Sequence, residues 1–239
     1  MSDGTNETAR PRSRHIFIGD IHGCYDELVE LLDQLSPSSH DTVISLGDLT
    51  RKGPDPVGCL DLFVGHGYQA VQGNQDRALI ALSRFPARLF LPHNDRALAH
   101  RQDLMLWISS LPLSLDFPGI GVAAVHGGVL PGVSFADQAA LRDAGILTNL
   151  RFVRQCGEEW IPIPRSRKQE GDVFWAEVWN GDRFIVYGHT PRSVPRRDSA
   201  ALGLDTGCVY GGALTAGVFD GETWTTHSVR ARRAYKTKS

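Results

Sequence analysis

Short apolar runs punctuate the first third of the chain at regular intervals. Residues 15–19, 42–46 and 69–72 are each bounded by polar or glycine-containing stretches, which predicts three buried strands. The first two runs lead into Gly-Asp and the third leads into Gly-Asn. A polar residue with a ligand oxygen is therefore expected at the end of each strand.

Each of these strands is followed by a segment of helical character. In residues 25–35 the leucines recur at helical spacing, and the prolines near the start of residues 54–63 suit a first helical turn. A third helix is predicted over residues 77–85, with Asn74 as its cap. Strands that alternate with helices predict a parallel sheet, and such sheets bind ligands at the carboxyl ends of their strands.

The second half of the chain predicts two further strands that lead into histidines. Residues 120–125 lead to His126, and residues 183–187 lead to His189. Helices are expected over residues 95–111 and 135–147, and an irregular functional loop is expected within residues 131–172. The last predicted strands, which we expect to be antiparallel, are residues 200–204, 213–219 and 223–229.

Composition narrows the class of protein. The net charge of −2 gives no field that favours nucleic acid, and no apolar run approaches the roughly 18 residues of a membrane span. The four cysteines form no CxxC pair, which favours a reducing compartment. We expect a cytoplasmic monomer without specific nucleic-acid binding. Its expected parts are a loose N-terminus (1–14), one domain (15–229) and a basic tail (230–239).

Five short motifs carry the candidate chemistry: GDIHG (19–23), GDLTRKG (47–53), GNQD (73–76), HGG (126–128) and GHT (188–190). Their oxygen and nitrogen side chains suit manganese, iron, zinc or a related ion better than calcium. Six such groups exceed what one ion usually takes, so a carboxylate that bridges two ions about 3.5–4 Å apart is expected. The candidate ligands are Asp20, His22, Asp48, Asn74, His126 and His189.

In this order and at this spacing, the motifs resemble the calcineurin-like metallophosphoesterase superfamily, in its phosphoprotein-phosphatase branch. GDLTRKGPDP together with LDTGCVYGG (204–212) is most similar to the bacterial diadenosine-tetraphosphatase-like group. The resemblance implies an α/β sandwich of two mixed sheets flanked by helices. It also implies two divalent metal ions, manganese first, with iron, zinc, cobalt or nickel as alternatives.

The resemblance assigns roles residue by residue. Asp20, His22 and Asp48 would bind one ion, and Asp48 would bind the other together with Asn74, His126 and His189. Lys52 and Arg151 would contact the substrate phosphate, beside Asn74. A hydroxide that bridges the ions would attack phosphorus in a phosphoprotein, a nucleotide or a polyphosphate. The other basic clusters, residues 165–168 and 230–238, are expected to be solvated surface unless they bind a polyanion.

Gln75 departs from the family pattern. A histidine at this position, paired with the following acid (Asp76 here), would protonate the leaving oxygen, and glutamine has no proton to give. We therefore expect a bias towards anhydrides and aryl phosphates, whose leaving groups need little help. Three alternatives are an engineered change at Gln75, a proton supplied by His66 or His93, and a catalytically impaired phosphate- or nucleotide-binding protein.

Overall fold

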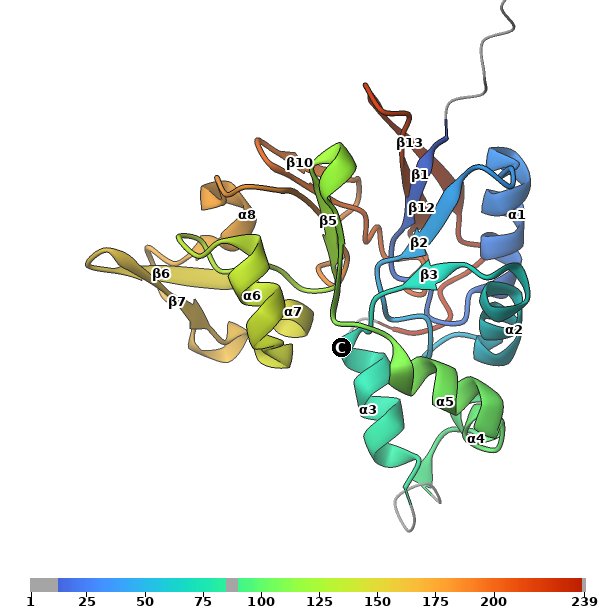
Figure 1. Cartoon of the computed structure of the whole chain (residues 1–239). Coiled ribbons are helices and arrows are strands. Elements are labelled where there is room, and N and C mark those ends of the chain that lie inside the picture. Colours follow the sequence, from blue (N-terminus) through green and yellow to red (C-terminus); the bar gives the residue numbers. More distant parts are fainter. Residues whose placement is uncertain (1–12, 85–89, 238–239) are drawn as a thin grey trace, which may run out of the picture.

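The computed structural model describes residues 13–84 and 90–237. Two mixed sheets of five strands face each other, and helices cover their outer sides (Figure 1), which confirms the predicted α/β sandwich. The first sheet has the order β13-β12-β1-β2-β3, with β1 (His15–Ile18), β2 (Thr42–Ser45), β3 (Gln69–Ala70), β12 (Ala213–Phe219) and β13 (Trp224–Arg230). The second has the order β10-β11-β9-β5-β4, with β4 (Ser114–Phe117), β5 (Val122–Val125), β9 (Phe184–Tyr187), β10 (Arg196–Asp198) and β11 (Ala201–Gly203).

Parallel pairing places the ends of the motif-bearing strands together. β1, β2 and β3 run parallel in the first sheet, as predicted, and β5, β9 and β11 run parallel in the second. The expectation that residues 200–204 join the two following strands in an antiparallel arrangement is wrong, because β11 lies in the second sheet, parallel to β9 and antiparallel to β10. The β12–β13 pair is the antiparallel hairpin that was expected.

Alternate side chains of each central strand enter different cores. Phe17 packs between the two sheets, whereas Ile16 and Ile18 pack under the helices of the first sheet. Ile44 and Val43 divide in the same way along β2. Because both faces of these strands are buried, the strands have continuous apolar sequences, and for that reason the sequence alone predicts them.

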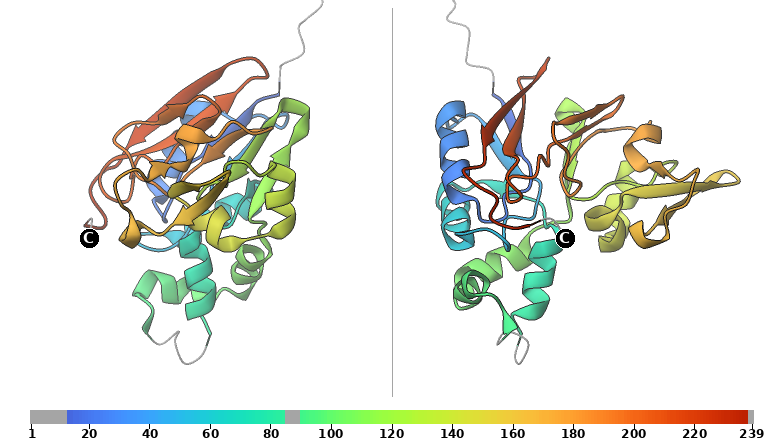
Figure 2. Two further views of the ribbon diagram at one scale, coloured as in Figure 1. Left: turned by 90° about the vertical axis from the view of Figure 1, so that its left-hand side faces the viewer. Right: turned by 180° about the vertical axis from the view of Figure 1, so that it is seen from behind.

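The helices divide between the two sheets (Figure 2). α1 and α2 cover the outer face of the first sheet, and α6, α7 and α8 pack with the second sheet around the buried Trp175 and Trp179. None of the helices in the described ranges is long and apolar enough to cross a membrane. The helices are α1 (Tyr25–Leu35), α2 (Pro56–His66), α3 (Asn74–Leu82), α4 (His93–Ala99), α5 (Gln102–Ser110), α6 (Phe135–Leu141), α7 (Ala144–Asn149) and α8 (Trp175–Val178).

Two predicted helices are each broken in two. The segment 95–111 forms α4 and α5, and the segment 135–147 forms α6 and α7. At the second break Arg142 adopts a left-handed backbone with φ 51°, and the Asp143 side chain then caps α7. The third helix also differs from expectation, because α3 begins at Asn74 with Gly73 as its N-cap, so Asn74 is not the cap. Residue 85, the predicted end of α3, lies outside the described residues.

The polar, proline-rich segment expected to be a loop forms a third, three-stranded sheet. Its order is β7-β6-β8, and in Figure 1 it projects from the side of the second sheet. Pro162 lies in β7, an edge strand, where a missing N–H is tolerated. The sheet comprises β6 (Phe152–Cys156), β7 (Glu159–Ile163) and β8 (Val173–Phe174), with short 3₁₀ turns elsewhere at η2 (Pro118–Ile120) and η3 (Arg165–Arg167).

An ion pair joins the starts of β1 and β2. Asp41 accepts hydrogen bonds from the Arg14 guanidinium at 2.7 Å and from the Ser38 N–H at 2.8 Å. Burial raises the pKa of Asp41, but these hydrogen bonds outweigh it and hold the pKa well below its usual range. The Asp41 side chain is only 2% exposed, so solvent screens the pair weakly.

We predict that Asp41→Asn lowers the free energy of unfolding by about 1–3 kcal/mol at pH 7. The folded-state pKa is depressed, so the stabilisation is complete above the unfolded-state value of about 3.9 and is lost as pH falls through the folded-state value. Urea midpoints at pH 7 and near pH 3.5 should show a narrowing gap between the two proteins. Asp33→Asn, at an exposed position of α1, should hardly change the free energy of unfolding. A difference between the wild type and Asp41→Asn that is the same at both pH values would contradict this account.

Candidate metal centre

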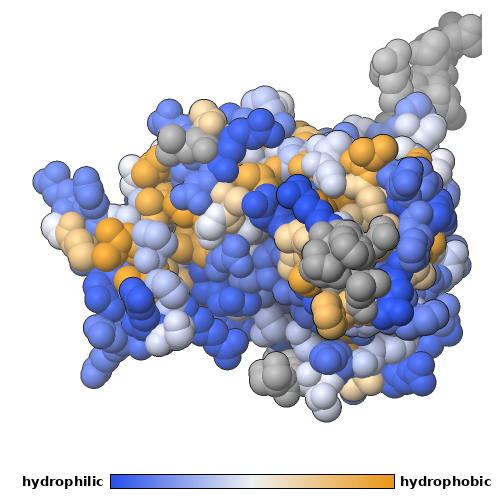
Figure 3. Space-filling view, turned by 90° about the horizontal axis from the view of Figure 1, so that it is seen from below, coloured by the Kyte–Doolittle hydropathy of each residue, from blue (hydrophilic) through white to orange (hydrophobic). Residues whose placement is uncertain are grey.

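A cavity of about 670 Å³ lies where the carboxyl ends of the central strands meet. Figure 3 views the molecule from below, and hydrophilic residues occupy the middle of this face between hydrophobic patches. The cavity lining includes predicted residues from four of the motifs: Asp20, His22, Asp48, Lys52, Asn74, Gln75 and His189. His126, from the remaining motif HGG, lies completely buried beside them.

Two carboxylates share the buried floor of this cavity. One ligand atom each from Asp20, Asp48 and His126 lies within 4.8 Å of the others. Burial raises the pKa of Asp20 strongly, and the nearby Asp205 and Asp48 raise it further. Buried carboxylates that repel each other in this way are stabilised by a cation placed between them.

His22 is held with the lone pair of one ring nitrogen on the side of these carboxylates. Its Nδ1 lies 3.1 Å from the carbonyl oxygen of Thr50, which can only accept, so the proton is on Nδ1. Nε2 then faces the Asp48 carboxylate at 3.5 Å. Burial chiefly lowers the pKa of His22 to about 4, so the ring is neutral at neutral pH and its Nε2 is available as a ligand.

The second half of the site repeats this arrangement. His126 Nδ1 lies 2.8 Å from the carbonyl oxygen of Leu46, which leaves Nε2 facing Asn74 Oδ1 at 3.0 Å and Asp48 Oδ1 at 3.4 Å. His189 Nδ1 also lies 3.0 Å from Asn74 Oδ1. Burial lowers the pKa of His189 well below its usual value, with help from His126 and Arg151. Oxygens and imidazole nitrogens that face one another in this way are arranged to share a cation.

The residues present therefore fit divalent metal ions. Carboxylate, amide and imidazole donors converge from separate strands, and this mixed set suits manganese, iron or zinc. All six side chains predicted as ligands meet here, although they span almost the whole chain. They are Asp20, His22, Asp48, Asn74, His126 and His189.

The backbone at the site is strained. His22, Asp48 and His189 adopt left-handed conformations with φ 50°, 50° and 66°, each of which costs roughly 1–3 kcal/mol. Two glycines allow the loops to approach: a Cβ at Gly73 or at Gly188 would lie 2.2 Å from Oδ1 of Asp48 or of Asp20. The surrounding core holds these conformations so that the side chains reach a common point.

Asp76 and Gln75 diverge although they are adjacent. Asp76 is buried, and its oxygens accept from the Thr50 hydroxyl at 2.7 Å and from the Gly73 N–H at 3.0 Å. Gln75 lines the cavity, and its backbone N–H donates to Asp48 Oδ1 at 2.7 Å. The structure thus gives Asp76 a place between two motif loops, while its predicted pairing with position 75 stays a prediction.

The predicted phosphate contacts also lie at the cavity. Lys52 Nζ is 2.9 Å from His22 Nε2, where it places a positive charge beside the carboxylates. Arg151 precedes β6 and donates to the carbonyl oxygen of His189 at 3.0 Å. Burial and the nearby Arg165 lower the pKa of Arg151, which shows that two guanidinium groups lie close together at the cavity.

Several cavity residues were not singled out from the sequence. Asp205 is buried and lies two residues beyond β11, within the LDTGCVYGG stretch (204–212), so a signal for it was present in the chain. Burial chiefly raises the pKa of Asp205 to about 6. Thr190 lies in the GHT motif and Tyr210 in the LDTGCVYGG stretch, whereas no local pattern marked the remaining lining residues, which are Asn149, Phe152, Pro191 and Arg192. Arg165 also lines the cavity, within a cluster expected to be solvated surface unless it binds a polyanion.

Comparison with known protein families gives a match over most of the chain. Residues 13–217 match the calcineurin-like phosphoesterase family. A bis(5'-nucleosyl)-tetraphosphatase PrpE [asymmetrical] of Halalkalibacterium halodurans is 31% identical over 229 residues, covering 83% of this chain and 87% of the relative. A zinc-dependent endopolyphosphatase of Saccharomyces cerevisiae is 24% identical, covering 84% and 74%.

Solved structures agree with this match. The crystal structure of a candidate diadenosine tetraphosphatase superposes with a TM-score of 0.75 at 30% identity, covering 91% of this chain and 94% of the other. A serine/threonine phosphatase of Saccharomyces cerevisiae gives a TM-score of 0.56 at 13% identity, covering 94% and 82%, which shows a shared fold only.

We predict that Asp48→Asn weakens the binding of Mn²⁺ by at least about 10–100-fold, because Asp48 lies between both groups of candidate ligands. Equilibrium dialysis followed by elemental analysis measures the bound metal directly. Asp61→Asn serves as the matched control, since Asp61 is about half-exposed and pairs with Arg101 on the surface. Equal metal binding by the two variants would exclude Asp48 as a ligand.

Proposed function

Because this chain belongs to the calcineurin-like phosphoesterase family of metal-dependent phosphohydrolases, we propose that it cleaves phosphoanhydride bonds in nucleoside polyphosphates. One observation carries this choice of substrate class. Four basic side chains, Lys52, Arg151, Arg165 and Arg192, line the cavity together with the candidate metal ligands, which is more positive charge than a single phosphoryl group requires. The tetraphosphatase and endopolyphosphatase names of the relatives support the same class.

Two divalent ions are the cofactors that we propose. Asp20, His22 and Asp48 would hold one ion, and Asp48 would hold the other with Asn74, His126 and His189. Manganese is our first expectation, because the ligands are oxygen and nitrogen without sulfur, and iron, zinc, cobalt or nickel fit the same set. When bound, the ions supply positive charge for the phosphoryl oxygens and for the attacking water.

The chain's own residues hold the substrate in line with the ions. Lys52, whose Nζ lies beside His22, would donate to an equatorial phosphoryl oxygen and offset the charge that develops there. Arg151 is fixed by its hydrogen bond to His189, so its remaining N–H groups are oriented before the substrate arrives. Asp48 is held by the Gln75 N–H, which keeps its carboxylate in position.

A chain of phosphates would continue along the basic side of the cavity. Arg165 and Arg192 line it together with Lys52 and Arg151. Guanidinium groups bind phosphate oxygens through two hydrogen bonds at once, which suits successive phosphates better than a peptide. Phe152 also lines this cavity, and its ring, with Lys168 Nζ 4.9 Å from its centroid, would add an apolar contact for a base.

Gln75 is consistent with an anhydride substrate. A phosphate-terminated leaving group needs little protonation, whereas a serine alkoxide needs a general acid that glutamine cannot be. None of the relatives described above has a name that favours the alternative, a catalytically impaired binding protein. A cytoplasmic location and a monomeric state remain our expectations from composition.

We predict that Gln75→His raises hydrolysis of a phosphoserine peptide by up to about 10²–10⁴-fold. Diadenosine tetraphosphate and p-nitrophenyl phosphate should change less than about tenfold, because their leaving groups need no acid. Steady-state rates of the Mn²⁺-loaded protein on the three substrates provide the measurement.

Gln69→His, at an exposed position of β3, controls for the added imidazole and should leave all three rates unchanged. An equal change for every substrate at Gln75→His would contradict the leaving-group explanation. If the unaltered protein binds metal but hydrolyses none of the three substrates, the proposed function itself fails.

We also predict that Arg165→Ala raises KM for diadenosine tetraphosphate by about 3–10-fold, with little change for p-nitrophenyl phosphate, because only the longer substrate reaches that part of the cavity. The difference should shrink at high salt, since the arginine is exposed. Arg167→Ala, in the same 3₁₀ turn and outside the cavity lining, is the matched control. Equal effects of both substitutions would mean that only general surface charge matters.

A further inference from the structure

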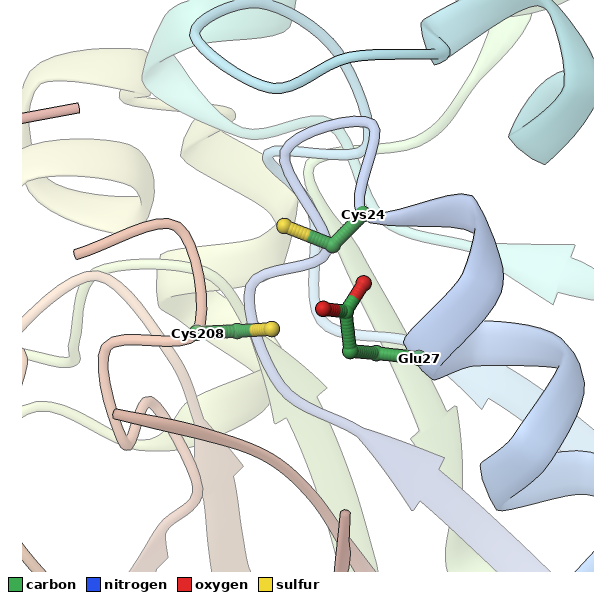
Figure 4. Close-up of side chains that lie close together, drawn as sticks. All are labelled: Cys24, Glu27 and Cys208. Carbon is green, nitrogen blue, oxygen red and sulfur yellow. The ribbon is translucent and has the colours of Figure 1, made fainter. Parts of the chain in front are cut away.

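A second group of metal-binding side chains lies at the start of α1, separate from the candidate metal centre. Cys24 is the N-cap of α1, Glu27 lies in its first turn, and Cys208 comes from the loop between β11 and β12. One ligand atom from each residue lies within 4.8 Å of the other two. Figure 4 shows both sulfur atoms and the carboxylate pointing towards one another.

The group is sealed from solvent and incompletely satisfied. Cys24 and Glu27 are 0% exposed, and Cys208 is 1% exposed. Glu27 Oε1 accepts from the Arg232 backbone N–H at 2.9 Å and from the Tyr235 hydroxyl at 2.8 Å. Its Oε2 is buried without a hydrogen-bond partner. The Arg232 guanidinium does not offset the charge, because it pairs with Asp26 at 2.6 Å instead.

We propose that Cys24, Glu27 and Cys208 form a structural site for a zinc-class cation. A buried carboxylate oxygen without a partner is costly, and a bound cation would remove that cost. Two sulfur ligands and one carboxylate select a borderline or soft divalent ion over magnesium or calcium. A zinc-class ion usually takes four ligands, and the Cys59 thiol of the same buried core cluster is the candidate for the fourth.

Such an ion would join three parts of the chain that the catalytic cavity depends on. Cys24 follows His22 by two residues, and Cys208 follows Asp205 by three. The third part is the segment 232–236. Tyr235 donates its hydroxyl hydrogen bond to Glu27, and the backbone N–H groups of Tyr235 and Lys236 donate to the carbonyl oxygen of Val209. Each thiol would release its proton as the sulfur binds the ion. Because the three ligands converge only in the folded chain, binding would stabilise the folded state.

Cobalt substitution tests the site by a readout that does not depend on hydrolysis. The wild-type protein, kept anaerobic with a phosphine reductant, is titrated with Co²⁺ and followed by near-ultraviolet absorption. We expect a sulfur-to-cobalt charge-transfer band that saturates at one equivalent and disappears when Zn²⁺ is added. The candidate catalytic ligands contain no sulfur, so Co²⁺ bound there gives no such band. Absence of the band, with Co²⁺ bound by dialysis, would overturn the proposal.

Matched cysteine variants assign the sulfur atoms. The Cys24→Ser/Cys208→Ser double variant should lose the band completely, and Cys156→Ser should retain it, because Cys156 is exposed on β6. Circular dichroism establishes that each variant is folded. If the double variant unfolds, Glu27→Gln keeps the shape of the side chain and should weaken Co²⁺ binding at least tenfold. A band that persists in the folded double variant, or one lost in Cys156→Ser, would refute the assignment.

Discussion

The repulsion between buried carboxylates at the strand ends governs the architecture of this site. Asp20 and Asp48 end neighbouring parallel strands, so the pairing of β1 with β2 places the two charges together. The second sheet closes the arrangement by bringing His126 and His189 against them. A sandwich of two sheets can deliver ligands from both sides to one point, which a single sheet could not do as readily. The topology of the strands thus creates a cluster of carboxylates whose negative charge favours bound cations.

Rigidity at the site comes from hydrogen bonds that link the motif loops to one another. Thr50 uses its carbonyl oxygen to orient His22 and its hydroxyl to hold Asp76, so one loop residue connects two motifs. Left-handed backbone at the ligands persists because these contacts and the buried core determine it. The proposed sulfur site at the start of α1 would reinforce the same loops from behind.

The small third sheet adds basic and aromatic side chains to the lining of the cavity that holds the candidate metal ligands. Arg151 and Phe152 lie at the start of β6, and Arg165 lies in the turn after β7. Arg192 follows the last metal-site motif and faces the same space. The extended substrate proposed for this protein depends on this sheet, whereas the candidate metal centre depends only on the sandwich. Gln75 is consistent with such a substrate, because hydrolysis of a phosphoanhydride depends on positive charge and orientation more than on protonation of the leaving group.

The sequence by itself determined the strands and the candidate ligands. Central strands such as β1 and β2 are buried on both faces, so their apolar runs are unbroken, and each delivers a chemically distinct residue after a glycine. Only the tertiary structure decided the breaks within helical segments, the pairing of β11 with β9, and the third sheet with its edge proline. Arg192 joins the cavity in the same way. These features follow from contacts between residues far apart in the chain, and such contacts leave no periodic pattern in the local sequence.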